Sequence, residues 1–309
     1  MSSLSTALSQ VTNQPRYKMT LDRRNPHQPF DASLIAGFLR GRGVRSVDLL
    51  QAGKINTNYK LVLTDGLACV LRLYSRSDAA REVYVMGLVR DFVPVPVELD
   101  RGDGWSIFEF LEGELLENAP QHSAAAGEAL ARIASVEFES PGMINADGSI
   151  SSFDFGGRGF IHQQLENADV LRWIGREAAE SVLSILDRES ERRSEIGVES
   201  RLVHGDFNAT NILIRGGAVS GILDWEFGMS GTPYMDIGNL LRNTPPRCHD
   251  LVQKGLRAGG MDLPDDWKQR AELVDLGSHL EYLTSTRSDE FKRQCVARVR
   301  RFISMFGGS

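Results

Sequence analysis

The segment between residues 202 and 226 constrains the possible folds of this chain more than any other. It contains three apolar runs with the length and composition of short β-strands: Leu202–Val203, Ile212–Ile214 and Val219–Leu223. Strands this short are not stable alone, so they must be paired inside a larger fold. Asp206, Asn211 and Asp224 lie at the ends of these strands, and the short loops allow their side chains to point toward one centre.

These three side chains are of the types that phosphoryl transfer needs. One carboxylate can orient an attacking hydroxyl, and a second carboxylate with an amide oxygen can hold Mg²⁺ against the phosphates. Mg²⁺ prefers oxygen ligands and usually takes only one or two carboxylates from a protein. The spacing therefore indicates a phosphoryl-transfer centre. The simpler interpretation is that Asp206 belongs to a turn and Asp224 only ends a strand.

The sequence HGDFNATN, followed by ILDWE on the next strand, resembles the catalytic loop and metal-binding segment of the aminoglycoside phosphotransferase and choline kinase family. That family has a protein-kinase-like fold and uses ATP with Mg²⁺. The resemblance implies that Asp206 is the catalytic base and that Asn211 and Asp224 are Mg²⁺ ligands. It also implies that His204 holds the loop in place and takes no part in the chemistry.

The loop from Ala52 to Tyr59 resembles the family's phosphate-covering loop, in which two glycines are followed by an asparagine and an aromatic residue. Gly53, Asn56 and Tyr59 match this pattern, whereas Ala52 replaces the first glycine. Because backbone N–H groups in such a loop can reach phosphate, Gly53 and Asn56 are expected to bind the nucleotide. A plain β-turn is the alternative.

Arg72, in the run Val70-Leu71-Arg72-Leu73, resembles the cation that contacts the nucleotide phosphates in the family. Its permanent charge and forked donors suit phosphate oxygens. Glu82, early in a predicted helix, is placed like the family's acidic partner of that cation. The alternative for Glu82 is an exposed helix charge that pairs along the helix surface.

The run from Trp105 to Gly113 resembles the family's inter-lobe connector. The resemblance implies that the backbone around Glu109 and Phe110 binds the adenine. A simple edge strand is the alternative, since backbone recognition leaves little side-chain signature. Further along, Asp236 is expected to cap a helix and to brace the catalytic loop. Glu226 is expected either in the same cleft or on the surface.

Hydrophobic periodicity predicts an α+β fold with a β-rich N-terminal lobe and a mainly helical C-terminal lobe. The resemblance implies that this is the bilobal protein-kinase-like fold. Strands are expected at 46–50, 59–63, 68–74, 95–99 and 106–111, with a hairpin turn at Asp65-Gly66. Helices are expected at 79–89, 123–136, 161–173, 176–192 and 267–283, and the three short strands should form one β island. The expected parts are an N-terminal tail (1–30), a nucleotide-binding lobe (31–108), a connector (109–113) and a catalytic and substrate-binding lobe (114–309).

Composition limits the partners and the compartment. The net charge of −6 argues against nucleic acid as a partner, and no apolar run approaches the ~18 residues of a membrane span. Cys69, Cys248 and Cys295 are scattered, which predicts neither a disulfide framework nor a zinc site. A cytoplasmic protein is therefore expected, with its oligomeric state left open.

The combined expectation is an ATP-dependent phosphotransferase that acts on a hydroxyl of a small molecule, such as a metabolite, an amino-alcohol, a sugar or an aminoglycoside. Residues 105–200 hold 18 acidic and 7 basic side chains, which leaves a cationic amine open as acceptor. Residues 224–309 have no acidic excess, so a small hydroxylated metabolite is favoured over an antibiotic.

Two alternatives differ in class. A regulator that binds nucleotide without turnover should have altered metal ligands, and none is altered. A protein kinase should have an activation segment ending in Ala-Pro-Glu after Asp224, but Pro233 and Asp236 follow too closely for one.

Overall fold

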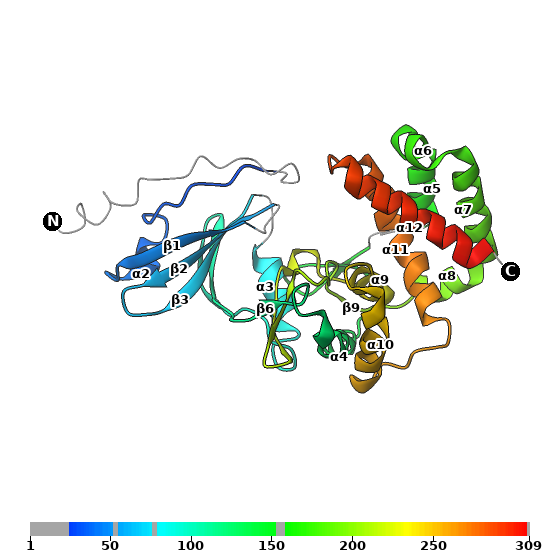
Figure 1. The fold of residues 1–309 in the computed structure, drawn as a ribbon. Coiled ribbons are helices and arrows are strands. Elements are labelled where there is room, and N and C mark those ends of the chain that lie inside the picture. The colour runs from blue at the N-terminus through cyan, green and yellow to red at the C-terminus, as the bar shows by residue number, and fades with distance from the viewer. Residues whose placement is uncertain (1–24, 52–54, 76–78, 153–157, 308–309) are drawn as a thin grey trace.

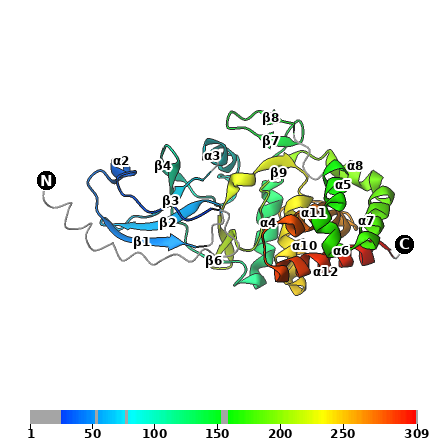
Figure 2. The ribbon, with the colours of Figure 1, turned by 90° about the horizontal axis from the view of Figure 1, so that it is seen from above.

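The computed structural model describes residues 25–51, 55–75, 79–152 and 158–307. A five-stranded sheet from the first part of the chain lies at one end of an elongated molecule, and helices from the second part form the other end (Figure 1, Figure 2). This arrangement confirms the predicted α+β class. The exact boundaries 31–108, 109–113 and 114–309 stay predictions.

The large sheet is antiparallel throughout, in the spatial order β1 (Val44–Leu50), β2 (Thr57–Leu63), β3 (Ala68–Leu73), β5 (Trp105–Glu109) and β4 (Glu98–Gly102). Along β2 every second side chain is buried, as expected for a sheet with one covered face. Tyr59, Leu61 and Leu63 form its core together with side chains of β3, β5 and the short helix α2 (Ala36–Leu39).

Asp65-Gly66 forms the predicted hairpin turn between β2 and β3. Gly66 has φ +93°, which favours glycine, and the Asp65 carboxylate accepts a hydrogen bond from the N–H of Leu67 at 3.0 Å. The strand predicted at 95–99 begins instead at Glu98. Pro94 and Pro96 explain the shift, because proline has no N–H to donate to a sheet.

Helix α3 (Ala79–Gly87) lies between β3 and β4 in sequence but packs with the helical part. Val85 and Met86 are buried in the same cluster as side chains from α4, α9 and α11, and Phe108 of β5 joins them. The core of the sheet is a separate cluster. The helix therefore lies between the two parts and contacts both (Figure 1).

The helical part consists of α4 (Ser123–Ile133), α5 (Arg158–Glu166), α6 (Ala168–Ile174), α7 (Arg176–Arg188), α8 (Ser190–Gly197), α9 (Tyr234–Arg242), α10 (His249–Ala258), α11 (Trp267–Thr284) and α12 (Asp289–Gly307). The single helix predicted at 161–173 is wrong. Asn167 divides it, because the Asn167 side chain caps α6 by accepting from the N–H of Asp169 at 2.8 Å. The helix predicted at 176–192 similarly ends at Arg188.

Helices α4 and α10 approach each other closely. A Cβ at Gly255 would lie 1.9 Å from the carbonyl oxygen of Ala124, and one at Gly127 would lie 2.4 Å from the carbonyl oxygen of Val252. Only glycine fits at such contacts between backbones. These residues therefore fix the position of α10 against the core.

The prediction of one β island is wrong, because the short strands divide between two small sheets. Strands β10 (Ile212–Arg215) and β11 (Ala218–Ile222) pair with β6 (Glu114–Leu115). Strand β9 (Arg201–Val203) instead pairs with β12 (Met229–Gly231), next to β7 (Gly142–Ile144) and β8 (Ile150–Ser151). The chain between β9 and β10 thus crosses from one sheet to the other, and this crossing carries Asp206.

Cys69, Cys248 and Cys295 are free and buried. Over the described ranges, no helix combines the length and apolar character that a bilayer crossing requires.

Candidate active site

The Asp206 carboxylate lies in the loop between β9 and β10 and is held by side-chain amides. One oxygen accepts from Asn208 Nδ2 at 2.8 Å and from Asn239 Nδ2 at 3.3 Å, and the other accepts from Asn211 Nδ2 at 3.0 Å. Asn211 also donates to the Asp206 backbone carbonyl at 2.9 Å. These donors fix the carboxylate while leaving the residue partly exposed.

The backbone of the loop that carries Asp206 is held by Asp236. Its two carboxylate oxygens accept from the N–H groups of His204 and Gly205 at 2.6 and 3.0 Å. Asp236 is 1% exposed, and burial raises the pKa of its carboxyl to about 7 although these N–H bonds lower it. The bracing role is confirmed. The capping role is wrong, because Asp236 lies inside α9 and Pro233 precedes the helix.

His204 contributes to the same support. Its Nε2 lies 2.9 Å from the carbonyl oxygen of Leu223, and its Nδ1 accepts from the N–H of Asp206 at 3.2 Å. This arrangement requires a neutral ring protonated on Nε2, and burial lowers the pKa of the imidazole accordingly. His204 thus links the Asp206 loop to the end of β11, as expected.

Asn211 and Asp224 lie side by side at the ends of β10 and β11. Ile212 pairs with Ile222, and the N–H of Leu223 donates to the Asn211 carbonyl at 2.8 Å. Asp224 has φ +67°, an uncommon backbone conformation that aspartate tolerates better than most residues.

This pair fits Mg²⁺. The Asn211 amide nitrogen is engaged by Asp206, which leaves its oxygen for a cation. The Asp224 side chain is 29% exposed. One carboxylate and one amide oxygen at adjacent strand ends are ligands that Mg²⁺ accepts.

Arg72 connects the large sheet to this pair. Its guanidinium forms one ion pair with Glu82 of α3 and another with Asp224. Arg72 is 8% exposed and Glu82 is 2% exposed, and Glu82 also accepts from the Tyr74 hydroxyl at 3.2 Å. Burial is the larger influence on Glu82 and raises the pKa of its carboxyl. The alternative of an exposed helix charge at Glu82 is wrong.

Asn56 lies above the same centre. Its Nδ2 donates to a carboxylate oxygen of Glu226 at 3.1 Å, and its Oδ1 accepts from the N–H of Ser75 at 3.1 Å. Glu226 therefore faces this site, and burial raises its pKa to about 7, with further upward influence from the Asp224 charge. Gly53 lies outside the described residues.

The connector residues are partly engaged. The N–H of Glu109 donates to the carbonyl of Val97 at 2.9 Å, so this amide is already bonded. The ring of Phe110 lies beneath the Lys60 ammonium, 3.8 Å from the ring centre.

Arg81, next to Glu82 on α3, binds the backbone at β7 and just before β12. Its guanidinium donates to the carbonyl oxygens of Ile144 and Glu226, each at 2.7 Å, and to that of Gly228. Sequence reasoning missed this residue, because three bonds to backbone carbonyls leave no sequence pattern.

Three further side chains around Asp206 were also missed: Asn208, Asn239 and Arg242. Asn239 and Arg242 follow Asp236 at successive three-residue steps, which place them on one face of α9. Arg242 donates to Asn239 Oδ1 at 2.7 Å and forms a buried ion pair with Asp275. The polar spacing inside an otherwise apolar helix was the available signal.

Comparison with solved structures shows similarity to antibiotic phosphotransferases over nearly the whole chain. A ternary complex of a thermostable mutant of aminoglycoside phosphotransferase APH(4)-Ia with AMP-PNP and hygromycin B has 19% identity and a TM-score of 0.67, covering 91% of this chain and 100% of that chain. ADP-bound aminoglycoside phosphotransferase APH(2'')-Ib has 16% identity and a TM-score of 0.62, covering 90% and 99%. Macrolide 2'-phosphotransferase MphH from Brachybacterium faecium has 16% identity and a TM-score of 0.62, covering 87% and 98%.

At these identities the similarity establishes the fold, so the predicted kinase-like architecture is confirmed. No curated protein matches the sequence. The phosphotransferase enzyme family (APH) matches residues 46–273, which is most of the chain. The chain therefore belongs to the phosphotransferase enzyme family.

Proposed function

We propose that this protein transfers the γ-phosphate of ATP to a hydroxyl of a small molecule in the presence of Mg²⁺. The observation that carries the proposal is the grouping of Asp206, held by amides, with the adjacent Asn211–Asp224 pair and the Arg72–Glu82 ion pair. Two relatives of this fold contain AMP-PNP and ADP, which supports ATP as the donor.

Each residue has a role that follows from its surroundings. Asp206 receives the acceptor hydroxyl and its proton, since its carboxylate is fixed and partly exposed. Arg72 binds the nucleotide phosphates while Glu82 keeps its guanidinium oriented. Mg²⁺ held by Asn211 and Asp224 would neutralise phosphate charge. The site carries out little covalent chemistry and acts by positioning and charge.

The remaining nucleotide contacts come from the large sheet and the connector. Asn56 is assigned to the phosphate-covering loop. Its hydrogen bond to Glu226 supports this assignment, because Glu226 faces the site from the other part of the chain. At the connector, the Glu109 carbonyl and the backbone from Phe110 onward are assigned to the adenine, since the Glu109 N–H is bonded to Val97. Gly53 keeps its sequence-based assignment to the phosphates.

The acceptor we propose is a small hydroxylated metabolite. Tyr282 at the end of α11 is close enough to Asp206 for the two to interact electrostatically. Arg287, in the link between α11 and α12, lies 4.7 Å from the ring centre of Tyr282 and 4.5 Å from that of Phe291 on α12. The positive charge of Arg287 would repel a polycationic drug and so disfavour its binding beside Asp206. Hygromycin B in the APH(4)-Ia complex shows only that this fold accepts small hydroxylated ligands in that protein.

The test is Asp206→Asn, with Asp265→Asn as the matched control because Asp265 is exposed on a loop. ADP release with Mg·ATP is first screened over alcohols, amino-alcohols and sugars to find an acceptor. Asp206→Asn should then lower kcat by about 10²–10⁴-fold and leave Mg·ATP binding by calorimetry nearly unchanged. Turnover equal to wild type would remove Asp206 from its role. Binding of ATP with no acceptor over the whole screen would favour a regulator without turnover.

A further inference from the structure

A cavity lies between α9, the turn at Pro246–Cys248, α11 and α12. Its volume is about 220 Å³, below the ~300–1,000 Å³ of ordinary ligand pockets but enough for several waters or one small ion. Its polar lining consists of three arginines, two histidines, two carboxylates and a threonine: Arg242, Arg298, Arg301, His249, His279, Glu272, Asp275 and Thr244. Asp206 does not line it, although Arg242 does.

The two carboxylates in this cavity are already paired. Asp275 contacts Arg242 and His279, and Glu272 contacts Arg301. Arg298 is half-buried on α12 and donates to the backbone carbonyl of Arg242 at 3.2 Å. No carboxylate of the described residues lies within ion-pair distance of Arg298. Its pKa is lowered, first by burial and then by the nearby Arg242 charge.

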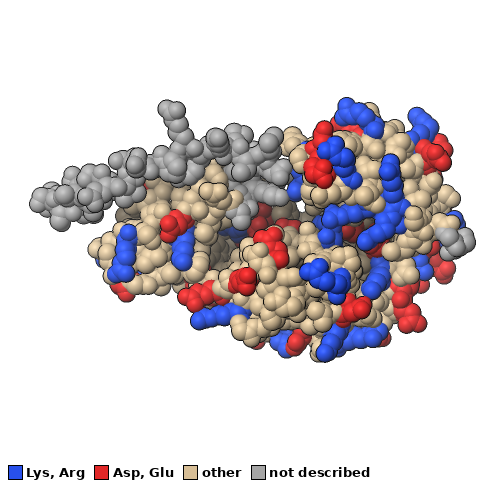
Figure 3. Space-filling model, viewed as in Figure 1, with Lys and Arg blue, Asp and Glu red and all other residues tan. Residues whose placement is uncertain are grey.

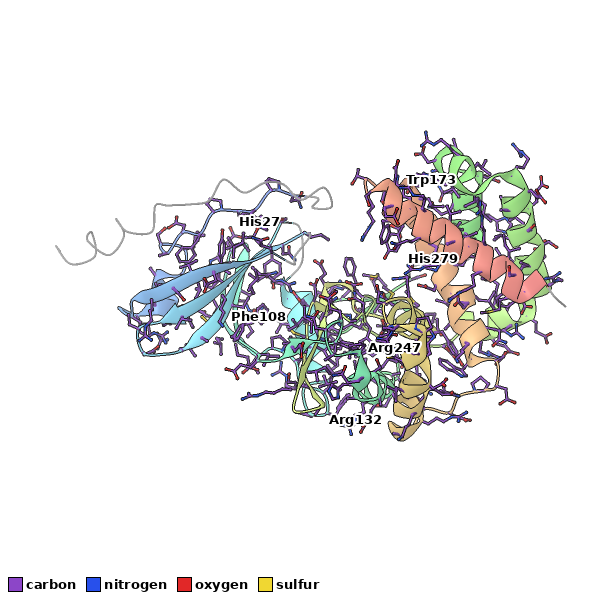
Figure 4. The ribbon with its side chains drawn as sticks, in the orientation of Figure 1. His27, Phe108, Arg132, Trp173, Arg247 and His279 are labelled. Carbon is purple, nitrogen blue, oxygen red and sulfur yellow. The ribbon has the colours of Figure 1, made fainter. Side chains whose placement is uncertain are left out.

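His279 provides an independent observation. It is 3% exposed, and its Nε2 lies 3.2 Å from an Asp275 oxygen. Its Nδ1 is buried with no hydrogen-bond partner among the described residues. Buried polar atoms are rarely left without a partner, and His279 lines the cavity. In Figure 4 its side chain lies on α11 where α12 crosses that helix.

We propose that this cavity binds a small oxyanion, a phosphate or a carboxylate group, between Arg298 and His279. An anion there accepts from the Arg298 guanidinium and from a protonated Nδ1 of His279. It thereby supplies the charge that Arg298 lacks and the partner that His279 lacks. Basic side chains are grouped over α12 on the face in Figure 3, which favours the approach of an anion from that side.

The bound anion would also act on the catalytic loop, and this step rests on the proposed function. Arg242 lines the cavity, and the same guanidinium holds Asn239, which donates to Asp206. An anion beside Arg242 therefore favours the arrangement in which Asn239 and Asp206 stay in contact. The site would make turnover depend on the concentration of a small anion.

Binding is tested on the full chain without nucleotide or acceptor, so its outcome is independent of the proposed function. Inorganic phosphate and acetate are titrated separately by calorimetry into wild type, Arg298→Gln and Arg300→Gln. Arg300 is exposed on α12 and does not line the cavity, which makes it the matched control. Loss of one charge-assisted hydrogen bond should weaken binding about tenfold to a hundredfold in Arg298→Gln and leave Arg300→Gln like wild type.

The two titrations identify which oxyanion is preferred. Equal binding by wild type and Arg298→Gln, or no binding of either anion to wild type, overturns the proposal. A second measurement uses ¹⁵N-histidine labelling: the Nδ1 resonance of His279 should shift with the anion in wild type and not in Arg298→Gln. An unchanged His279 resonance at saturating anion would also overturn it.

Discussion

The buried ion pair between Arg72 and Glu82 allows a direct test of whether polar groups here are retained for stability or for function. Both side chains are almost fully buried, at 8% and 2% exposure. Removing one partner of such a pair leaves an unpaired buried charge and typically destabilises a protein by about 3–5 kcal/mol. In Glu82→Gln the amide oxygen can still accept a hydrogen bond from Arg72, and Arg72 keeps its ion pair with Asp224. We therefore expect the free energy of unfolding to fall by about 3 kcal/mol.

Replacing both partners should have a different result. Arg72→Met with Glu82→Leu removes both buried charges, and such replacements are often neutral or stabilising. The Tyr74 hydroxyl loses its Glu82 acceptor, at a cost of about 1–2 kcal/mol. Asp224 remains hydrated, since its side chain is 29% exposed. The double variant should therefore be more stable than Glu82→Gln and still fail to bind Mg·ATP.

Urea unfolding followed by circular dichroism gives the free energies, and calorimetry gives nucleotide binding. Glu112→Gln is the control, because Glu112 pairs with Arg215 at the surface, where both side chains are more than 60% exposed. It should change stability by less than about 1 kcal/mol. A double variant less stable than Glu82→Gln would refute the reasoning, because the pair would then contribute net stability.

Two further predictions concern the scaffold. Gly255→Ala should destabilise the fold by about 1–3 kcal/mol or more, because its Cβ would meet the Ala124 carbonyl. Gly197→Ala, with open space around it, should not, and equal unfolding midpoints would contradict the helix contact. The pKa of the Asp236 carboxyl is raised to about 7. Its contribution to the free energy of unfolding therefore falls as pH rises from about 4 to 7, because over this range the folded state binds more protons than the unfolded state. Asp236→Asn does not titrate, so its stability difference from wild type should shift in its favour by up to about 4 kcal/mol over that range; a shift the other way would mean an ionised carboxylate.

Local patterns predicted those elements of the fold whose signals are local. The hairpin at Asp65-Gly66 followed from backbone preferences of two residues, and the strands β2 and β3 from alternation on either side. The boundaries and pairings that were predicted wrongly depend on tertiary contacts or on single residues. Pro94 and Pro96 delayed β4, Asn167 divided one helix into two, and the partner of β9 is a strand that follows it by many residues.

The site divides in the same way. Asp206, Asn211 and Asp224 could be singled out because the phosphoryl transfer proposed for them uses these residue types at strand ends. Asn239 and Arg242 act through α9, and nothing in their local sequence states which loop that helix faces. Their contacts arise only once α9 packs between the Asp206 loop and α11, which is a property of the whole fold.

The neighbours Arg81 and Glu82 on α3 have a mechanical consequence. Successive side chains on a helix point about 100° apart. Arg81 donates to backbone carbonyls outside the large sheet, whereas Glu82 forms an ion pair with Arg72 of the sheet. A rotation of the sheet relative to the helical part would change the geometry of both contacts, because Arg81 and Glu82 lie on one turn of α3. Such a movement would therefore shift the guanidinium of Arg72, the residue proposed to bind the nucleotide phosphates.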